Sequence, residues 1–462
     1  MEGNDRVDLR DIRVDTSYLN GDDGVPVGEV LKRLEFQRTE VLKLIPTDDL
    51  EIQRILKSAE APSAIEGESL RERRERLVEL VFQNPELKSH LTQEVFSGAD
   101  SENGAESDDE EFYTPASDAL IQARRFMVRD SLARARKRLQ LEKSRASIQN
   151  VQAIIVGRRK LNAKLATYEL QGSQVVSSRP ISQVTLSPDH RHAACGSWKG
   201  DVQILNPETL EVIAALETAH DGKIGGLHWN SSSQLLVTGG ADNMVKIWDP
   251  LSQDLKAEFR GHEARVARVK FHPSDKYIAS ASFDMTWRLW DVETQVELQL
   301  QEGHSKEVYS LDFQADGSLL CSAGLDSIAR VWDLRSGQSL MVFKGHAKPI
   351  YGVSWSPNGH HIATGSGDGT VKVWDLRNIE KPFSILAHNN IVSDVNFGKN
   401  NGYCLVTSSY DKTIGVFAAD SWIKLASLRG HTDKILSVDI SSDGTQLLSC
   451  GWDRSVKKWS LN

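Results

Sequence analysis

The chain has 462 residues, with 55 Lys and Arg against 64 Asp and Glu and a formal net charge of -9 at pH 7. This length exceeds one ordinary hydrophobic core, so we expect two or three units. The 4 cysteines lie too far apart for a disulfide framework or zinc-ligand spacing. No apolar run is long enough to span a bilayer, and the first residues lack the pattern of a signal peptide. We therefore expect a soluble intracellular protein without a bound metal or cofactor.

Two short helices are predicted after an N-terminal extension, residues 1–44, that carries no motif. Within residues 45–97, Thr47 and Asp48 provide capping groups for a helix whose apolar face includes Ile52 and Leu56. A second helix is expected over residues 69–82, before the Pro85 breaker. Two helices of this length bury little surface, so we expect them to dock on each other or on a partner.

An acidic stretch and then a basic stretch follow these helices. Residues 98–111 carry 7 acidic and no basic side chains and suit a solvated linker. Residues 112–166 are strongly basic, and residues 117–145 contain neither Pro nor Gly, which predicts one or two helices. These helices have four candidate roles: contact with RNA phosphates, contact with a partner protein, nuclear import, or simply a solvated helix without a partner. Their candidate residues are Arg124, Arg125, Arg129, Arg134, Arg136, Lys137 and Arg138.

The remainder of the chain repeats with a nearly constant period. Gly-His or Ala-His pairs begin at residues 219, 261, 303, 345, 387 and 430, and Trp-Asp or a degenerate copy follows each histidine by 28 or 29 residues. Between these marks lie runs of strand-forming residues separated by turn residues, which predicts four short strands in each unit. A degenerate unit precedes the six, with Ser177 at the histidine position and Leu205 at the tryptophan position.

This pattern resembles the WD40 family, whose units are four-stranded blades arranged in a ring. The resemblance implies an all-β seven-bladed WD40 β-propeller over residues 167–462, preceded by an N-terminal, mainly helical extension. Residues 167–175 belong to no blade of their own. In the family such a segment supplies the outer strand of the last blade and closes the ring, which removes exposed sheet edges.

Each full unit carries His, Ser or Thr, Asp and usually Trp at constant spacing. These residue types match a catalytic triad, but six copies at the same place in six units indicate a structural device. In the WD40 family they form a hydrogen-bond network inside the blade, so we predict neither a catalytic residue nor enzyme activity. The first unit, with Cys195 and Leu205, lacks this network. The network residues are His220, Thr238, Asp242, Trp248, His262, Ser280, Asp284, Trp290, His304, Ser322, Asp326, Trp332, His346, Thr364, Asp368, Trp374, His388, Thr407, Asp411, His431, Ser449, Asp453 and Trp459.

One rim of the predicted ring carries large aromatic side chains. The position before each network aspartate, and the start of each first strand, should face this rim. Aromatic and arginine side chains are the usual anchors of protein interfaces. The candidate partner-binding residues of the rim are Trp198, Arg265, Phe283, Tyr309, Leu325, Tyr351, Tyr410 and Trp452.

The order of helix pair, acidic stretch, basic helices and seven blades resembles the pre-mRNA-processing factor 4 family, the WD-repeat proteins of the U4/U6 small nuclear ribonucleoprotein. Residues 45–49 and 73–77 resemble its splicing-factor motif. In that motif the resemblance implies partner contacts by Leu56, Pro62, Arg73, Arg74 and Leu77. The Ala61-Pro62 turn departs from the family's usual Gly-Glu-Pro.

The resemblance implies a nuclear, non-catalytic scaffold of the U4/U6 particle and of the tri-snRNP in pre-mRNA splicing. Its partners would be a companion protein of the processing factor 3 family, a cyclophilin, and U4/U6 small nuclear RNA directly or indirectly. No membrane and no small-molecule substrate are expected. The alternative is a substrate receptor of a cullin ubiquitin ligase, because the Trp-Asp-x-Arg pattern of such receptors ends at Arg335 and again at Arg377.

Overall fold

A computed structural model describes residues 49–58, 62, 73, 76–78, 80–81, 117–148, 151–399 and 402–461. The chain divides into two compact units, Met1–Asp109 and Glu110–Asn462. The boundary between them lies within the predicted acidic linker. That linker, the N-terminal extension and Arg74 lie outside the described residues.

The first unit contains helix α2 (Asp49–Ser58), at the position where the capping pattern predicts a helix. Residues 76–78 and 80–81 are also helical. Ile52 and Leu56 of α2 pack in one apolar cluster with Leu77, Val78 and Val81. The two predicted segments therefore bury their apolar sides against each other.

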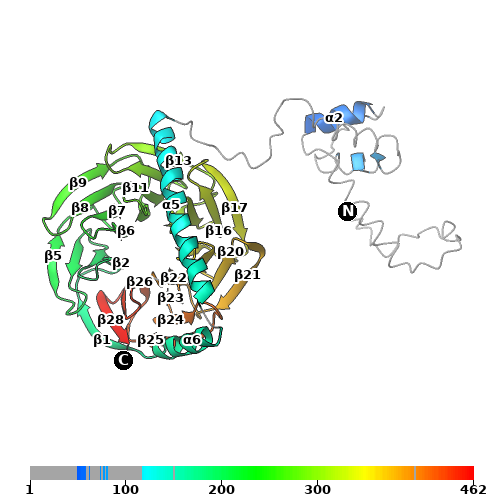
Figure 1. The fold of residues 1–462 in the computed structure, drawn as a ribbon. Helices are drawn as coiled ribbons and strands as arrows, with labels where there is room; N and C mark the ends of the chain where they lie inside the picture. The colour runs from blue at the N-terminus through cyan, green and yellow to red at the C-terminus, as the bar shows by residue number, and fades with distance from the viewer. Residues whose placement is uncertain are drawn as a thin grey trace, which may run out of the picture. The chain divides into compact units, whose positions relative to one another are not determined.

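The second unit is a ring of seven four-stranded antiparallel sheets, so the predicted seven-bladed propeller is confirmed (Figure 1). Each of the first six blades uses four consecutive strands. Blades one and two contain β2 (Ile181–Leu186), β3 (Ala193–Ser197), β4 (Val202–Leu205), β5 (Val212–Leu216), β6 (Ile224–Trp229), β7 (Leu236–Gly240), β8 (Val245–Asp249) and β9 (Asp254–Phe259). Blades three and four contain β10 (Val266–Phe271), β11 (Tyr277–Ser282), β12 (Trp287–Asp291), β13 (Glu297–Gln301), β14 (Val308–Phe313), β15 (Leu319–Gly324), β16 (Ile328–Asp333) and β17 (Gln338–Lys344). Blades five and six contain β18 (Ile350–Trp355), β19 (His361–Ser366), β20 (Thr370–Asp375), β21 (Asn378–Leu386), β22 (Val392–Phe397), β23 (Cys404–Ser409), β24 (Thr413–Ala418) and β25 (Lys424–Arg429).

The seventh blade joins the two ends of the ring. It contains β26 (Ile435–Ile440), β27 (Gln446–Gly451) and β28 (Ser455–Leu461), and its fourth strand is β1 (Tyr168–Val175). β1 pairs antiparallel with β28, from Tyr168 opposite Leu461 to Val175 opposite Ser455. The expected closure by residues 167–175 is thus present, and it covers the edge of β28 with backbone hydrogen bonds.

Burial decreases from the second strand of each blade to the fourth. All six residues of β11 are buried, and small residues such as Ala279 and Ala281 let the neighbouring blades approach. In β9, a fourth strand, three of the six residues are exposed. The packing between first strands is closest at Gly225 of β6, where an added Cβ would lie 2.1 Å from the Val266 carbonyl oxygen. Only glycine fits there.

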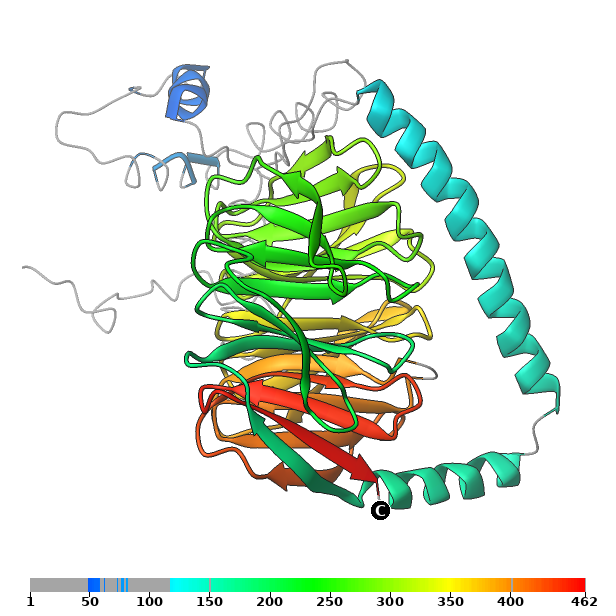
Figure 2. The same ribbon diagram turned by 90° about the vertical axis from the view of Figure 1, so that its left-hand side faces the viewer.

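Two helices precede the ring. α5 (Asp118–Ile148) begins after Ser117, whose hydroxyl accepts a hydrogen bond from the Leu120 N–H at 3.2 Å. This helix covers the predicted residues 117–145. α6 (Val151–Leu165) leads into β1 and lies beside β25. Seen face-on and edge-on, α5 crosses one face of the ring (Figures 1 and 2).

Candidate interaction surfaces of the propeller

The predicted network residues lie together inside six blades. In blade four, His304 Nδ1 is 2.8 Å from Asp326 and Nε2 is 2.8 Å from the Ser322 hydroxyl. The Trp332 indole N–H donates to the same hydroxyl at 2.8 Å. The other five blades repeat this arrangement, with histidine to hydroxyl distances of 2.7 or 2.8 Å. In blade six, Phe417 replaces the tryptophan, so no indole donor is present there.

The geometry of this network is that of a structural device. The Ser322 hydroxyl belongs to a residue with no exposed surface, so no substrate can reach it. In blade seven, burial alone would raise the pKa of Asp453, but its hydrogen bond with His431 lowers the pKa to about 2. The carboxylate therefore stays ionised and fixes the imidazole orientation. In blade one, the Ser177 and Ser197 hydroxyls share a single hydrogen bond of 2.7 Å instead.

The rim residues surround a cavity of about 240 Å³ at the mouth of the central channel. Trp198, Arg265, Phe283, Tyr309, Tyr351 and Tyr410 all line it. Leu325 is not among the residues that line this cavity. Trp452 packs edge-on against Trp198, with ring centroids 5.2 Å apart.

Cations cover the aromatic faces of this rim. The Arg265 guanidinium lies 3.7 Å from the Phe283 ring centroid, and the Lys223 ammonium lies 3.9 Å from that of Trp198. Lys434 lies 4.8 Å from the Trp452 ring centroid. The cavity lining contains no carboxylate. The rim is thus a basic and aromatic surface, in which cations lie against the faces of the aromatic rings.

Arg268 is a charged residue of the cavity that the sequence analysis missed. Arg268 is buried in β10, and its guanidinium donates to the Gly225 carbonyl oxygen at 2.8 Å. Its only sequence signal is a charged residue inside the apolar run of residues 266–269. Burial raises the pKa of the neighbouring Asp394, and the Arg268 charge partly offsets that rise.

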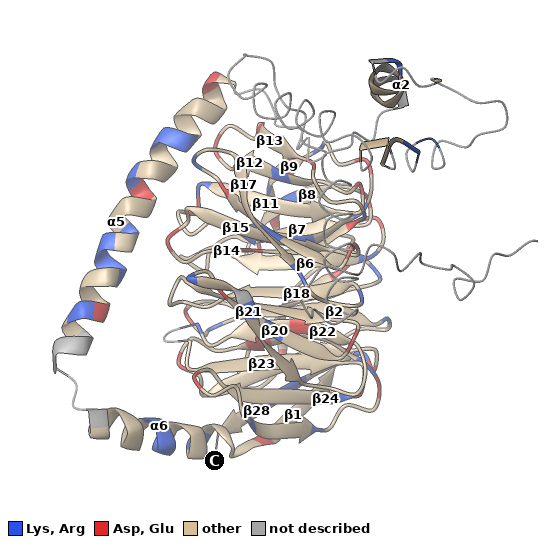
Figure 3. Cartoon of the chain, turned by 90° about the vertical axis from the view of Figure 1, so that its right-hand side faces the viewer, with Lys and Arg blue, Asp and Glu red and all other residues tan. Residues whose placement is uncertain are grey.

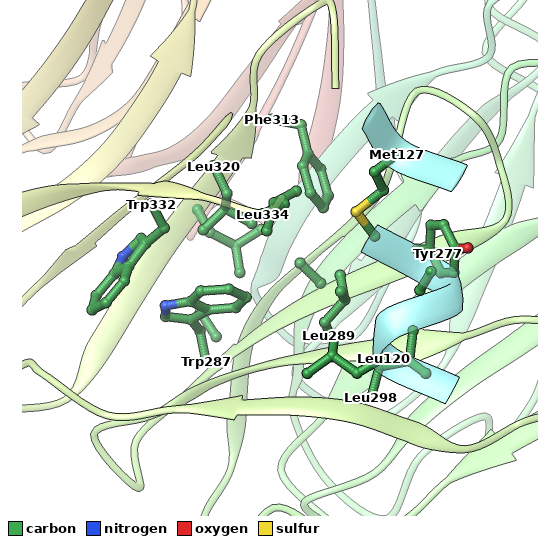
Figure 4. Packing of buried hydrophobic residues seen from close by; sticks show 14 of the residues in the cluster. Leu120, Met127, Tyr277, Trp287, Leu289, Leu298, Phe313, Leu320, Trp332 and Leu334 are labelled. Carbon is green, nitrogen blue, oxygen red and sulfur yellow. The ribbon is translucent and has the colours of Figure 1, made fainter. Parts of the chain in front are cut away.

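Helix α5 lies on the face opposite this rim. Strand β11 runs from one face to the other. Its first residue, Tyr277, packs against α5, and Phe283, which follows its last residue, belongs to the rim. Leu120 and Met127 of α5 are fully buried in a cluster with Leu334 and other residues of blades three and four (Figure 4). The apolar anchor of α5 therefore lies near its N-terminal end.

Lys and Arg recur along the length of α5 (Figure 3), but the seven predicted cations differ in exposure. Arg138 pairs with the buried Asp316 at 2.6 Å and donates to the Asn358 carbonyl oxygen at 2.8 Å. Burial lowers the pKa of Arg124, and Arg134 pairs with Asp130 of the same helix at 2.8 Å. Arg124 and Arg138 lie on the side of α5 that packs on the propeller, whereas Arg134 is paired within the helix itself. The exposed members of the set are Arg125, Arg129, Arg136 and Lys137.

Several residues predicted to contact a partner from the splicing-factor motif are buried within the helix pair. Leu56 and Leu77 have no exposed surface, because they form the core of the helix pair, and Arg73 is also buried. Pro62 is exposed, and its carbonyl oxygen accepts a hydrogen bond from Arg76 at 2.7 Å. The two leucines thus support the fold of the motif rather than present a partner surface.

Both arginines of the Trp-Asp-x-Arg pattern are held within their own turns. Arg335 pairs with Asp333 at 2.9 Å, and Arg377 pairs with Asp375 at 2.7 Å. Leu334 of the first pattern lies in the cluster that α5 covers. The feature that favoured a ligase receptor is accounted for by local structure.

The described part of the chain contains no group of three or more His, Cys, Asp or Glu side chains placed to hold a metal ion. No described helix is long and apolar enough to cross a membrane.

Comparison with known proteins shows similarity in both parts of the chain. The WD domain, G-beta repeat family matches residues 211–249, 253–291, 295–333, 337–375, 380–417 and 422–460. The U4/U6 small nuclear ribonucleoprotein PRP4 of Saccharomyces cerevisiae is 44% identical over 462 residues, which cover 98% of this chain and 99% of the relative. An uncharacterized WD repeat-containing protein of Schizosaccharomyces pombe is 38% identical over 46% of each chain. A U4/U6 small nuclear ribonucleoprotein PRP4-like protein of Arabidopsis thaliana is 35% identical over 59 residues, 13% of this chain and 11% of the relative.

Proposed function

The chain belongs to the family of the U4/U6 small nuclear ribonucleoprotein protein PRP4, and from this premise we propose that it is a non-catalytic scaffold of the U4/U6 particle and the tri-snRNP in pre-mRNA splicing. One observation carries the proposal: the similarity to PRP4 covers 98% of this chain and 99% of the relative. It therefore includes the N-terminal region as well as the repeats. Location in the nucleus follows from the same proposal.

The mechanism that we propose is multivalent tethering. The chain offers the rim cavity, the helix α5 on the opposite face and a separate N-terminal unit. Weak contacts at linked surfaces raise the effective concentration of one another, so a complex can be held without any single tight site. The partners in this proposal are a companion protein of the processing factor 3 family, a cyclophilin, and U4/U6 RNA directly or indirectly.

The rim is our candidate for one protein contact. Lys223, Arg265 and Arg268 line the cavity, and the lining itself contains no carboxylate. Burial raises the pKa of Tyr410 to about 12, so its hydroxyl stays neutral and can donate a hydrogen bond. An acidic segment of a partner protein would satisfy these donors.

The burial of the repeated hydroxyls supports a role without catalysis. The serine or threonine of each of the six networks has no exposed surface. Its hydrogen bonds join parts of one blade to one another. These residues therefore support the scaffold's rigidity.

The proposal is tested by purifying the tagged full-length protein from nuclear extract and sequencing the small RNAs and proteins that accompany it. We expect U4 and U6 RNA together with the companion protein and the cyclophilin. An Arg265→Glu/Lys434→Glu variant should lose a protein partner at least tenfold, because charge reversal at an interface repels an acidic segment. The control variant Lys256→Glu/Lys381→Glu makes the same charge change on fourth strands of the propeller, and it should keep that protein partner. Recovery of the tagged protein without enrichment of U4 and U6 RNA would refute the proposal.

A further inference from the structure

Helix α5 is apolar on two sides. One side packs on the propeller through the buried Leu120, Ala123 and Met127. A second row of aliphatic side chains lies exposed. Its members are Ile121 (36% exposed), Val128 (36%), Leu132 (58%) and Leu139 (47%).

These four residues are aligned along the helix. They recur at intervals of seven, four and seven residues, so on a helix with about 3.6 residues per turn they lie along one side. The stripe extends for about 27 Å, at about 1.5 Å per residue. Single exposed leucines are ordinary, but an aligned row of four marks an interaction surface. We call residues 121, 128, 132 and 139 the outer stripe.

Unpaired cations flank the outer stripe. Arg125, Arg129, Arg136 and Lys143 are exposed, and none forms an ion pair with another described residue. The nearby acidic residues of α5 are already engaged, because Asp130 pairs with Arg134 and Glu142 pairs with Arg138. A groove of about 620 Å³ is lined by Leu132 and Leu139 together with Arg129, Arg136 and Lys143.

We propose that the outer stripe of α5 binds an amphipathic helix of a partner protein, with an apolar row against the leucines and acidic residues against the flanking cations. This helix contact deepens the proposed function. It rests on that function only because the partner is taken to belong to the U4/U6 particle. A helix fits because a straight aliphatic row with charged flanks is the pattern of paired helices. Carboxylates fit because four cations lie along the row without internal partners.

RNA fits the outer stripe less well than a helix does. Phosphates would neutralise the arginines but would leave the aliphatic side chains in water. Bases bind by stacking on aromatic rings, and the outer stripe has none. Phe126, the aromatic residue of α5, is partly buried and packs instead against Tyr277 of the propeller, with ring centroids 6.0 Å apart.

The first test is a titration of the full-length protein with a synthetic heptad peptide that carries Leu at its core positions and Glu at its flanks. We expect Leu132→Ser and Leu139→Ser each to weaken binding roughly tenfold, because each removes a buried leucine contact. Leu141→Ser is the matched control, since Leu141 is 50% exposed but lies outside the outer stripe. Arg136→Glu should weaken binding more than Lys137→Glu. Equal effects of Leu139→Ser and Leu141→Ser, or no binding of the Glu peptide, would overturn the proposal.

The second test uses the assembled particle. A benzoylphenylalanine photo-crosslinker replaces Leu139 in one sample and Leu141 in another, and the tagged protein is purified from nuclear extract. We expect position 139 to crosslink to a protein segment with acidic flanks and position 141 to do so much less. Crosslinking of position 139 to RNA, or to nothing while U4 and U6 RNA are still recovered, would refute the helix contact and leave the scaffold proposal intact. Absence of both RNAs would instead refute the scaffold proposal, and the peptide titration would then decide the inference.

Discussion

Replacing Ser322 by alanine tests whether the repeated hydrogen-bond network stabilises its blade. The Ser322 hydroxyl accepts the Trp332 indole N–H at 2.8 Å and lies 2.8 Å from His304 Nε2. Since the ionised Asp326 can only accept, Nδ1 of a neutral His304 carries the proton and Nε2 accepts the hydroxyl proton. The substitution therefore leaves one buried donor and one buried acceptor without partners.

The expected loss of stability follows from those two groups. A buried polar group without a partner costs about 1–3 kcal/mol. Ser322 is completely buried, so water cannot replace the lost hydroxyl without disturbing the packing. We expect the Ser322→Ala variant to lose about 2–6 kcal/mol of unfolding free energy.

Chemical denaturation measures the global loss, and hydrogen exchange over β14 to β17 measures the local one. Ser322→Thr is the matched control, because blades two, five and six carry Thr238, Thr364 and Thr407 at the same place. It keeps the hydroxyl and should stay within about 1 kcal/mol of the parent. A loss below about 0.5 kcal/mol in Ser322→Ala, or equal losses in the alanine and threonine variants, would refute this account of the network.

Three further predictions concern other contacts. Arg138→Met removes the ion pair that attaches the C-terminal half of α5 to Asp316, so hydrogen exchange of that half should rise while the propeller's melting temperature changes little; unchanged exchange would contradict this. Burial lowers the pKa of His272 to about 4, so the folded chain keeps it neutral while the unfolded chain protonates it near pH 6.5. Stability should therefore be complete above pH 6.5 and fall between pH 6.5 and 4, and His272→Gln should flatten that fall in pH-dependent denaturation; an equal slope would count against it. Gly225→Ala should destabilise the propeller by about 3 kcal/mol or more in thermal unfolding, because its Cβ meets the Val266 backbone; a parent-like melting temperature would exclude that clash.

The functional surfaces were only partly readable from the sequence. Six of the eight predicted rim residues line the channel mouth, some from the position before a network aspartate and some from the start of a first strand, since both positions recur in every blade. Arg268 was missed because nothing in the run of residues 266–269 says which side chain reaches the channel. Leu56 and Leu77 were taken as partner contacts, but two short helices bury their apolar sides against each other first.

The sequence by itself determined the ring. A period of about 42 residues, repeated with the same marks, specifies identical blades, and identical blades can bury their faces only against one another. The sequence also determined the hydrogen-bond network of each blade, because His304, Ser322 and Asp326 lie at fixed spacing within one repeat. The repeats of the family match are offset from the blades by one strand. Residues 211–249, for example, contain β5 of one blade and β6 to β8 of the next, so each sequence repeat links two blades.

Only the tertiary structure decided what α5 does with its charges. The sequence shows a helix rich in arginine. The rotation of that helix on the propeller is set by contacts of Leu120, Met127 and Arg138 with partners some 150 to 220 residues away, in blades three to five. That rotation turns Arg138 towards Asp316 and leaves Arg129 and Arg136 beside an exposed row of leucines. The rotation of a helix about its axis is set by such long-range contacts, and the local sequence pattern does not specify it.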